Sequence, residues 1–364
     1  MKDQPRLRPA LRVALDSPLS GTEGGGLAPA VPVRMLGDAL TVVRERGGAI
    51  ALFDAAGRSY PVRDAGALIW TYLGPPGLEP AFPTYDWTRM PREQLCHMKY
   101  VERANYLQCA EGTIDTTHSW FLHSGSTPDW KQRTTLSLDF APKLEAEDTA
   151  YGFRYAAIRR PNVDPDKQKY VKVTVYVFPT TGFIARPLDP DLATLVQIFV
   201  PIDDESTMVY SLMHACNGKP VDVEGIRADL RQRPGIDQNA SWRPNFCTED
   251  GWIQDRPAMR ARTSYTGIYG FPNQDVAVQE SMGRIVDRTR EHLGTSDIAI
   301  IRMRRRMLDS IRRVMRGEPP IGLQGPVDYG NLRAEQAVIP IDVPWQSVGP
   351  AATYGEETYA LNVR

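Results

Sequence analysis

Short apolar runs separated by polar turns mark the first part of the chain. The runs cover residues 41–43, 49–53, 60–63 and 67–73, with small turn dipeptides at residues 47–48 and 56–57. Short runs bounded by glycine are typical of β-strands. Residues 32–80 are therefore predicted to form a small β-rich unit. Residues 1–31, which are rich in Gly, Ser and Pro, are predicted to be a flexible arm.

The middle of the chain contains a longer series of strand-like segments. Strands are expected at residues 134–140, 151–158, 169–178, 194–201 and 207–214. Their spacing, with polar turns between them, indicates one antiparallel sheet. Residues 92–123 lack strict alternation instead. This stretch predicts a helix that ends near His123, where a Ser-Gly-Ser-Thr-Pro sequence stops it.

Two later segments have helical periodicity. One begins near Gln274 and runs to Met282, and the other begins at Thr295 or Ser296 and runs to Gly317. Residues 317–364 contain several prolines and predict an extended strap. Together these elements predict an α+β fold, in which helices gather against one face of an antiparallel sheet.

Composition excludes several classes of protein. Of 364 residues, 42% are hydrophobic and 24% are charged, and 43 basic against 44 acidic residues leave a net charge of -1. This balance argues against a nucleic-acid binder. The four cysteines form no CxxC pair, so neither a zinc ribbon nor a disulfide framework is indicated. The longest apolar stretch is too short to span a membrane, and a cytoplasmic location with reduced thiols is expected.

Two of the five histidines, His118 and His123, lie close together in the sequence. Five residues on a helix rotate by about 500°, so a straight helix would not aim both rings at one point. If the helix is interrupted between them, both imidazoles could bind one metal, and a distant carboxylate would complete a two-His, one-carboxylate site for Fe(II). Two structural histidines are the alternative.

Two segments resemble the signatures of Rieske-type aromatic-ring-hydroxylating oxygenases, in particular the phthalate-dioxygenase-like class. The first is EGTIDTTHSWFLH at residues 111–123, and the second is NQDVAVQESMG at residues 273–283, which continues as DRTREHLGTSD at residues 287–297. The resemblance covers roughly residues 32–347. It implies a helix-grip catalytic domain at residues 81–316 and a homotrimer.

The resemblance also implies roles for individual residues. It identifies His118, His123 and Asp275 as ligands of a mononuclear Fe(II). Asp115 matches a bridging aspartate that, in the family, hydrogen-bonds an iron ligand and a cluster ligand of the neighbouring subunit. Asn105 lies on the same predicted helix and is a candidate catalytic residue, with helix capping as the alternative.

Arg154 is a candidate substrate-binding residue. It alternates with Phe153 and Tyr155 along a predicted strand and would therefore face away from these aromatic rings. From there its guanidinium group could bind a substrate carboxylate with two hydrogen bonds. A buried structural ion pair is the alternative.

One part of the family pattern is missing. Residues 32–54 and 60–77 resemble the strands that flank a Rieske cluster, but only five residues separate them, and no Cys precedes Cys96 and no His precedes His97. Because two Cys and two His ligands hold a Rieske [2Fe–2S] cluster, these 364 residues are predicted to bind none. Residues 32–80 are then the vestigial remnant of a Rieske domain.

The expected function is O2-dependent hydroxylation or demethylation of a small aromatic substrate, with or without a carboxylate group. Electrons would come in trans, from a Rieske ferredoxin or a reductase. Two alternatives remain at this point. One is a redox-silent enzyme with a Lewis-acid metal, and the other is a non-catalytic small-molecule-binding or partner subunit.

Overall fold

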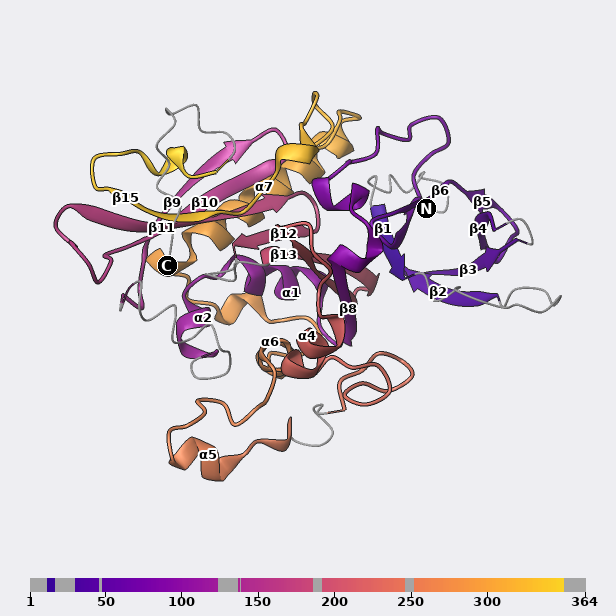
Figure 1. Cartoon of the computed structure of the whole chain (residues 1–364). Helices are drawn as coiled ribbons and strands as arrows, with labels where there is room; N and C mark the ends of the chain where they lie inside the picture. Colours follow the sequence, from indigo (N-terminus) through magenta and orange to yellow (C-terminus); the bar gives the residue numbers. More distant parts are fainter. Residues whose placement is uncertain are drawn as a thin grey trace.

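The computed structural model describes residues 12–16, 30–45, 48–123, 137, 139–185, 192–245 and 252–349. Its centre is an eight-stranded antiparallel sheet in the order β8-β14-β13-β12-β11-β10-β9, with β15 paired to β11 (Figure 1). The strands of this sheet are β8 (Leu95–Glu102), β9 (Lys143–Thr149), β10 (Gly152–Arg159), β11 (Gln168–Val177), β12 (Thr181–Ala185), β13 (Leu192–Asp203), β14 (Ser206–Ala215) and β15 (Gln336–Pro340).

The first part of the chain forms two smaller sheets, in the orders β1-β7-β6 and β2-β3-β4-β5. Residues 55–58 close a hairpin between β4 and β5. In this hairpin Asp54 Oδ1 accepts hydrogen bonds from the Ala56 and Arg58 amides, both at 2.9 Å. The strands are β1 (Arg12–Asp16), β2 (Val31–Met35), β3 (Asp38–Arg44), β4 (Ile50–Asp54), β5 (Ser59–Tyr60), β6 (Val62–Ala65) and β7 (Leu68–Tyr72).

Helices α1, α6 and α7 pack on one face of the large sheet, which confirms the predicted arrangement of helices and antiparallel strands. The α-helices are α1 (Tyr106–Ile114), α2 (His118–Phe121), α4 (Val223–Leu230), α5 (Arg256–Arg260), α6 (Phe271–Ser281) and α7 (Ile298–Met315). The 3-10 helices are η1 (Asp86–Arg89), η2 (Arg92–Gln94), η4 (Arg288–Arg290), η5 (Thr295–Asp297), η6 (Tyr329–Asn331) and η7 (Trp345–Ser347).

The large sheet has a separate apolar core on each face. Residues such as Phe153, Tyr155 and Tyr176 pack with the helices on one face, whereas Val175 and Val173 pack with the small N-terminal sheets on the other. Alternation along β10 and β11 therefore decides which side chains can reach a site under the helices. Among the described residues, no helix combines the length and apolar composition needed to cross a membrane.

Several predicted elements differ from the structure. The helix expected within residues 92–123 begins only at Tyr106, because β8 precedes it and pairs with β14. Strands β9 and β12 were not predicted. Of the strand expected at residues 134–140, only 137, 139 and 140 are described, and they are not in a strand. Arg12–Asp16, placed in the flexible arm, form β1 against β7. The other residues of the arm up to 29 lie outside the described residues.

Candidate metal centre

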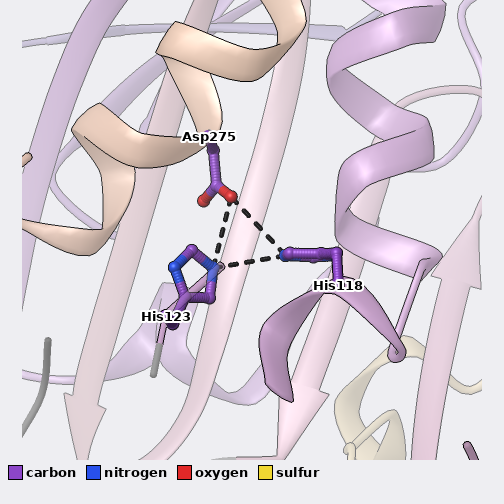
Figure 2. Close-up of side chains that lie close together, drawn as sticks. All are labelled: His118, His123 and Asp275. Carbon is purple, nitrogen blue, oxygen red and sulfur yellow. Dashed lines mark hydrogen bonds and ion pairs between the residues drawn. The ribbon is translucent and has the colours of Figure 1, made fainter. Parts of the chain in front are cut away.

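Three side chains from two distant segments converge under the helices. His118 Nε2 lies 3.2 Å from His123 Nε2 and 3.5 Å from Asp275 Oδ1, and His123 Nε2 lies 3.2 Å from the same carboxylate oxygen. Figure 2 shows the two rings and the carboxylate pointing toward one another. The structure thus brings together the three residues that the sequence resemblance implied as ligands. We call them the triad.

A break in the helix allows both histidines to reach one point. Helix α1 ends at Ile114. The next residue, Asp115, has an extended backbone, and its Oδ1 accepts hydrogen bonds from the Thr117 and His118 amides at 2.9 and 3.3 Å. The short helix α2 then carries His118, while His123 follows its end. The expected single helix is therefore two helices, and this interruption removes the rotation that would separate the rings.

The third member of the triad lies in the second turn of α6. This helix begins after Gly270, whose φ of 80° is unfavourable for residues with a Cβ atom. A Cβ atom at Gly270 would also lie 2.5 Å from the Leu230 carbonyl oxygen. The start of α6 therefore requires glycine, and it places Asp275 opposite α2.

The electrostatics of the triad fit a bound cation. Two imidazole nitrogens and a carboxylate oxygen are all within 4.8 Å of one another in a largely buried place. Burial alone would lower the pKa of His118, but the Asp115 and Asp275 carboxylates raise it to about 10. Burial would raise the pKa of Asp275, yet the two histidines hold it well below its usual range. A divalent cation bound by the triad would take the place of the proton that the raised pKa keeps on His118. Two imidazoles with one carboxylate suit Fe(II).

A cavity of about 250 Å³ lies beside the triad. Aromatic and aliphatic side chains, among them Phe199 and Leu195, form part of its wall, and about as many of the lining residues are polar or charged. Polar groups include Thr113, which donates a hydrogen bond to Gln197 at 2.6 Å, and the Lys172 ammonium. Lys172 is 8% exposed, and among the described residues lining the cavity it is the one lysine or arginine. The cavity therefore has a metal-ligand set on one wall and a buried cation on another.

Lys172 was not identified from the sequence, and Arg154 does not lie in this cavity. The Arg154 guanidinium forms an ion pair with Glu147 and lies 5.2 Å from the centre of the Trp345 ring. It is on the opposite face of β10 from Tyr155, which lines the cavity. This placement corresponds to the buried ion pair that was the alternative interpretation. A lysine at an inward position of the apolar run YVKVTVYVF was the signal for Lys172.

Asn105 also lies away from the triad. It is the N-cap residue of α1, where its Oδ1 accepts from the Leu107 amide at 3.1 Å and its Nδ2 donates to the Asp204 carbonyl at 2.8 Å. About 15 Å of helix separates this end of α1 from the triad end. The placement favours capping over catalysis. Asp115 lies at the triad, with Oδ2 3.6 Å from His118 Nδ1.

A buried acid, Glu102, lies behind α1. Its side chain is 1% exposed, and the end of the Gln279 side chain lies 3.1 Å from Glu102 Oε2. Burial, reinforced by the negative charges of Glu280 and Asp275, raises the pKa of Glu102 to about 8. Glu102 is therefore neutral in the folded protein at pH 7, whereas it is ionised in the unfolded chain.

Glu102→Gln is expected to stabilise the protein at high pH. The folded state holds the proton on Glu102 more tightly than the unfolded state, so the wild type loses stability as pH rises from about 4.5 to about 8. Glutamine does not ionise, so the variant does not lose stability in this way. In thermal unfolding we expect the variant to gain at least about 2 °C at pH 9 and little at pH 5. Glu79→Gln, at an exposed position, is the control. An equal gain at both pH values would contradict the assignment of a neutral buried acid.

The chain is similar to known oxygenase subunits. The family described as LigXa C-terminal domain like matches residues 71–363. The phthalate 4,5-dioxygenase oxygenase subunit of Pseudomonas putida is 36% identical over 297 residues, which cover 79% of this chain and 67% of that protein. The 3-chlorobenzoate-3,4-dioxygenase oxygenase subunit of Comamonas testosteroni is 28% identical, over 79% of this chain and 69% of that protein.

A solved structure shows the same fold. It is a fluorene-bound complex of the oxygenase and the ferredoxin of carbazole 1,9a-dioxygenase, with a TM-score of 0.50 and 14% sequence identity. The match covers 81% of this chain and 89% of that chain.

Proposed function

The chain belongs to the Rieske-type oxygenase subunits with a LigXa-like C-terminal domain, and we propose that it carries out O2-dependent hydroxylation or demethylation of a small aromatic acid. The convergence of His118, His123 and Asp275 carries this proposal. We also propose that the catalytic domain has the helix-grip form and that residues 32–80 are the remnant of a Rieske domain.

We assign Fe(II) to the triad. Held by two imidazoles and one carboxylate, Fe(II) supplies a centre at which O2 can be reduced beside a substrate. The protein orients the donor atoms for it. The Asp115 carboxylate lies behind His118, and Gln274 lies behind His123, so that both Nε2 atoms face Asp275. A substrate bound in the adjoining cavity would lie next to the triad.

Lys172 supports an anionic substrate. Lys172 is buried and lines the cavity beside the triad, and a lysine ammonium group can donate a charge-assisted hydrogen bond to a carboxylate. The relatives named above act on phthalate and 3-chlorobenzoate, which are both aromatic carboxylates. We therefore propose that Lys172 binds the carboxylate of an aromatic acid whose ring lies toward the triad.

Lys172→Met is expected to weaken the binding of phthalate by about tenfold or more, because a charge-assisted hydrogen bond is lost. Calorimetric titration of phthalate and of neutral benzamide measures the effect, and only phthalate should be affected. The control is Lys169→Met, on the same strand, whose ammonium group donates to the Ile341 carbonyl at 3.1 Å. Unchanged phthalate binding in Lys172→Met would remove this residue from the substrate site.

The electrons must come from outside these 364 residues, which have no ligand set for a Rieske cluster between the two flanking segments. The purified protein should therefore show no [2Fe–2S] absorption and no acid-labile sulfide. Oxygen uptake in the presence of an aromatic acid should depend on an added Rieske ferredoxin and reductase. A stoichiometric cluster would contradict the first expectation. Anaerobic conversion of the acid without any reductant would favour a Lewis-acid enzyme over an oxygenase.

The assembly of the chain into a homotrimer remains a prediction.

A further inference from the structure

Gln274 is a buried residue directly before Asp275 in the sequence, and the roles assigned so far use it only as a contact of His123. Its side chain is fully buried, at 0% exposure. Its Oε1 lies 2.7 Å from His123 Nδ1, and its Nε2 donates to the Ile268 carbonyl oxygen at 2.9 Å. The side chain thus connects a triad histidine with the loop before α6.

The two contacts determine which ring nitrogen of His123 carries the proton. A backbone carbonyl only accepts hydrogen bonds, so the end of Gln274 that faces Ile268 must be its NH2 group. The other end, the amide oxygen, must then face His123. An amide oxygen also only accepts, so His123 Nδ1 is the protonated nitrogen. In the neutral ring His123 Nε2 then carries the lone pair, and this atom faces His118 and Asp275, as a metal ligand requires.

The loop that orients Gln274 is itself held in place. Asn273 Nδ2 donates to the Tyr269 carbonyl at 3.0 Å, and Asn273 Oδ1 accepts from Gln232 Nε2 at 3.2 Å. Asn273 is also fully buried, at 0% exposure. Ile268 is therefore part of a fixed frame, and Gln274 cannot rotate its amide without losing the bond to it.

The two histidines have different supporting groups. A carboxylate, Asp115, lies 3.6 Å from His118 Nδ1, whereas a neutral amide lies 2.7 Å from His123 Nδ1. A carboxylate behind an imidazole raises its basicity more than an amide does. Two carboxylates behind the rings would also add a second negative charge next to Asp275. A neutral group at position 274 holds the ring without that charge.

We propose that Gln274 is the positioning residue that keeps His123 in its Nδ1–H tautomer and aims its Nε2 at the metal. This inference rests on the proposed metal site. It assigns a function to the middle residue of the Asn-Gln-Asp sequence at the start of α6, in which Asn273 fixes the loop and Asp275 is a ligand.

The test compares Gln274→Leu with Gln274→Glu by titrating the metal-free protein with Co(II). Outer groups of this kind are worth about 10–100-fold in metal affinity. Gln274→Leu, which accepts no bond from His123, should weaken Co(II) binding by about that factor. Gln274→Glu still offers an acceptor to Nδ1–H and should bind within about threefold of the wild type or more tightly.

Gln108→Leu is the matched control. Gln108 is a buried glutamine whose Nε2 donates to the Gly283 carbonyl at 3.0 Å and whose Oε1 accepts from the Val286 amide at 2.8 Å. Neither of these bonds involves a triad residue. It should lower thermal stability without changing Co(II) affinity. If Gln274→Leu and Gln108→Leu lose stability alike and both bind Co(II) as the wild type does, Gln274 is only structural and the proposal is wrong.

A second measurement works even if Gln274→Leu does not fold. In the wild-type protein loaded with Zn(II), long-range ¹⁵N–¹H spectra of the histidine rings should show His123 protonated at Nδ1. Protonation at Nε2 would overturn the proposal. If instead the assignment of the triad as a metal site is wrong, His118→Ala will bind Co(II) as tightly as the wild type, whatever residue is at position 274.

Discussion

Replacing Asp275 by alanine is expected to weaken metal binding by more than about a hundredfold while the protein remains folded. Groups behind a ligand are worth about 10–100-fold, and Asp275 is the carboxylate that both histidine Nε2 atoms face, at 3.5 and 3.2 Å. Its removal leaves two imidazoles with no anionic partner in the triad. Alanine at this position creates no overlap, so α6 should form as before.

Titration of the metal-free variant with Fe(II) under anaerobic conditions measures this loss, and circular dichroism checks the fold. Asp237→Ala is a suitable control. Asp237 is a buried aspartate that pairs with Arg233 and does not line the cavity. The variant should bind Fe(II) normally. If Asp275→Ala kept the affinity of the wild type, the assignment of this residue as a ligand would be wrong.

Arg243→Met is expected to cost about 3–5 kcal/mol of unfolding free energy, because it removes the cation that is paired with a buried carboxylate. Arg243 and Glu280 form an ion pair in which the side chains are only 8% and 2% exposed. Arg243 also donates to the Val101 carbonyl at 3.0 Å. Since Glu280 is on α6, this pair attaches the helix that carries Asp275 to strand β8.

Urea unfolding of three variants tests this expectation. The double variant Arg243→Met with Glu280→Gln should recover part of the loss, because the buried negative charge is removed together with the positive one. Arg233→Met breaks a pair in which the arginine is 28% exposed, so it should cost less than Arg243→Met. Equal losses in Arg243→Met and Arg233→Met would mean that burial of the Arg243 pair contributes little.

Much of the large sheet and the two later helices could be predicted from the sequence. The expected segments 151–158, 169–178, 194–201 and 207–214 coincide closely with strands β10, β11, β13 and β14. The apolar signal of these strands is strong because they are buried on both faces or nearly so, which gives near-continuous apolar runs. Strand β9 lies at the edge of the sheet and has the charged sequence KLEAEDT, so its apolar signal is weak.

The approach of the two histidines could not be predicted from local periodicity. It depends on the hydrogen bond that the Asp115 side chain accepts from the Thr117 amide. It also depends on contact with α6, which lies more than 150 residues further along the chain. Only the family motifs connected these segments in advance. The local pattern alone favoured two structural histidines over a metal site.

The substrate side of the cavity shows a second limit. Alternation correctly indicated that Arg154 faces away from Phe153 and Tyr155. It could not show that the cavity lies on the aromatic face, because that depends on which face the helices cover. Lys172 pairs with Ala157 across β11 and β10, so its side chain lies on the helix side of the sheet, where the cavity is. Arg154 lies on the other face.

The central claim is that the triad holds iron, and the metal content of the chain tests it most directly. Elemental analysis after anaerobic purification should find about one iron per chain in the wild type and none in His118→Ala purified in parallel. A stoichiometric redox-inert metal such as zinc, retained after exchange is excluded, would contradict the claim and favour a Lewis-acid enzyme. A folded wild-type protein with no metal, and none taken up on anaerobic incubation with Fe(II), would contradict it and leave a binding subunit as the function.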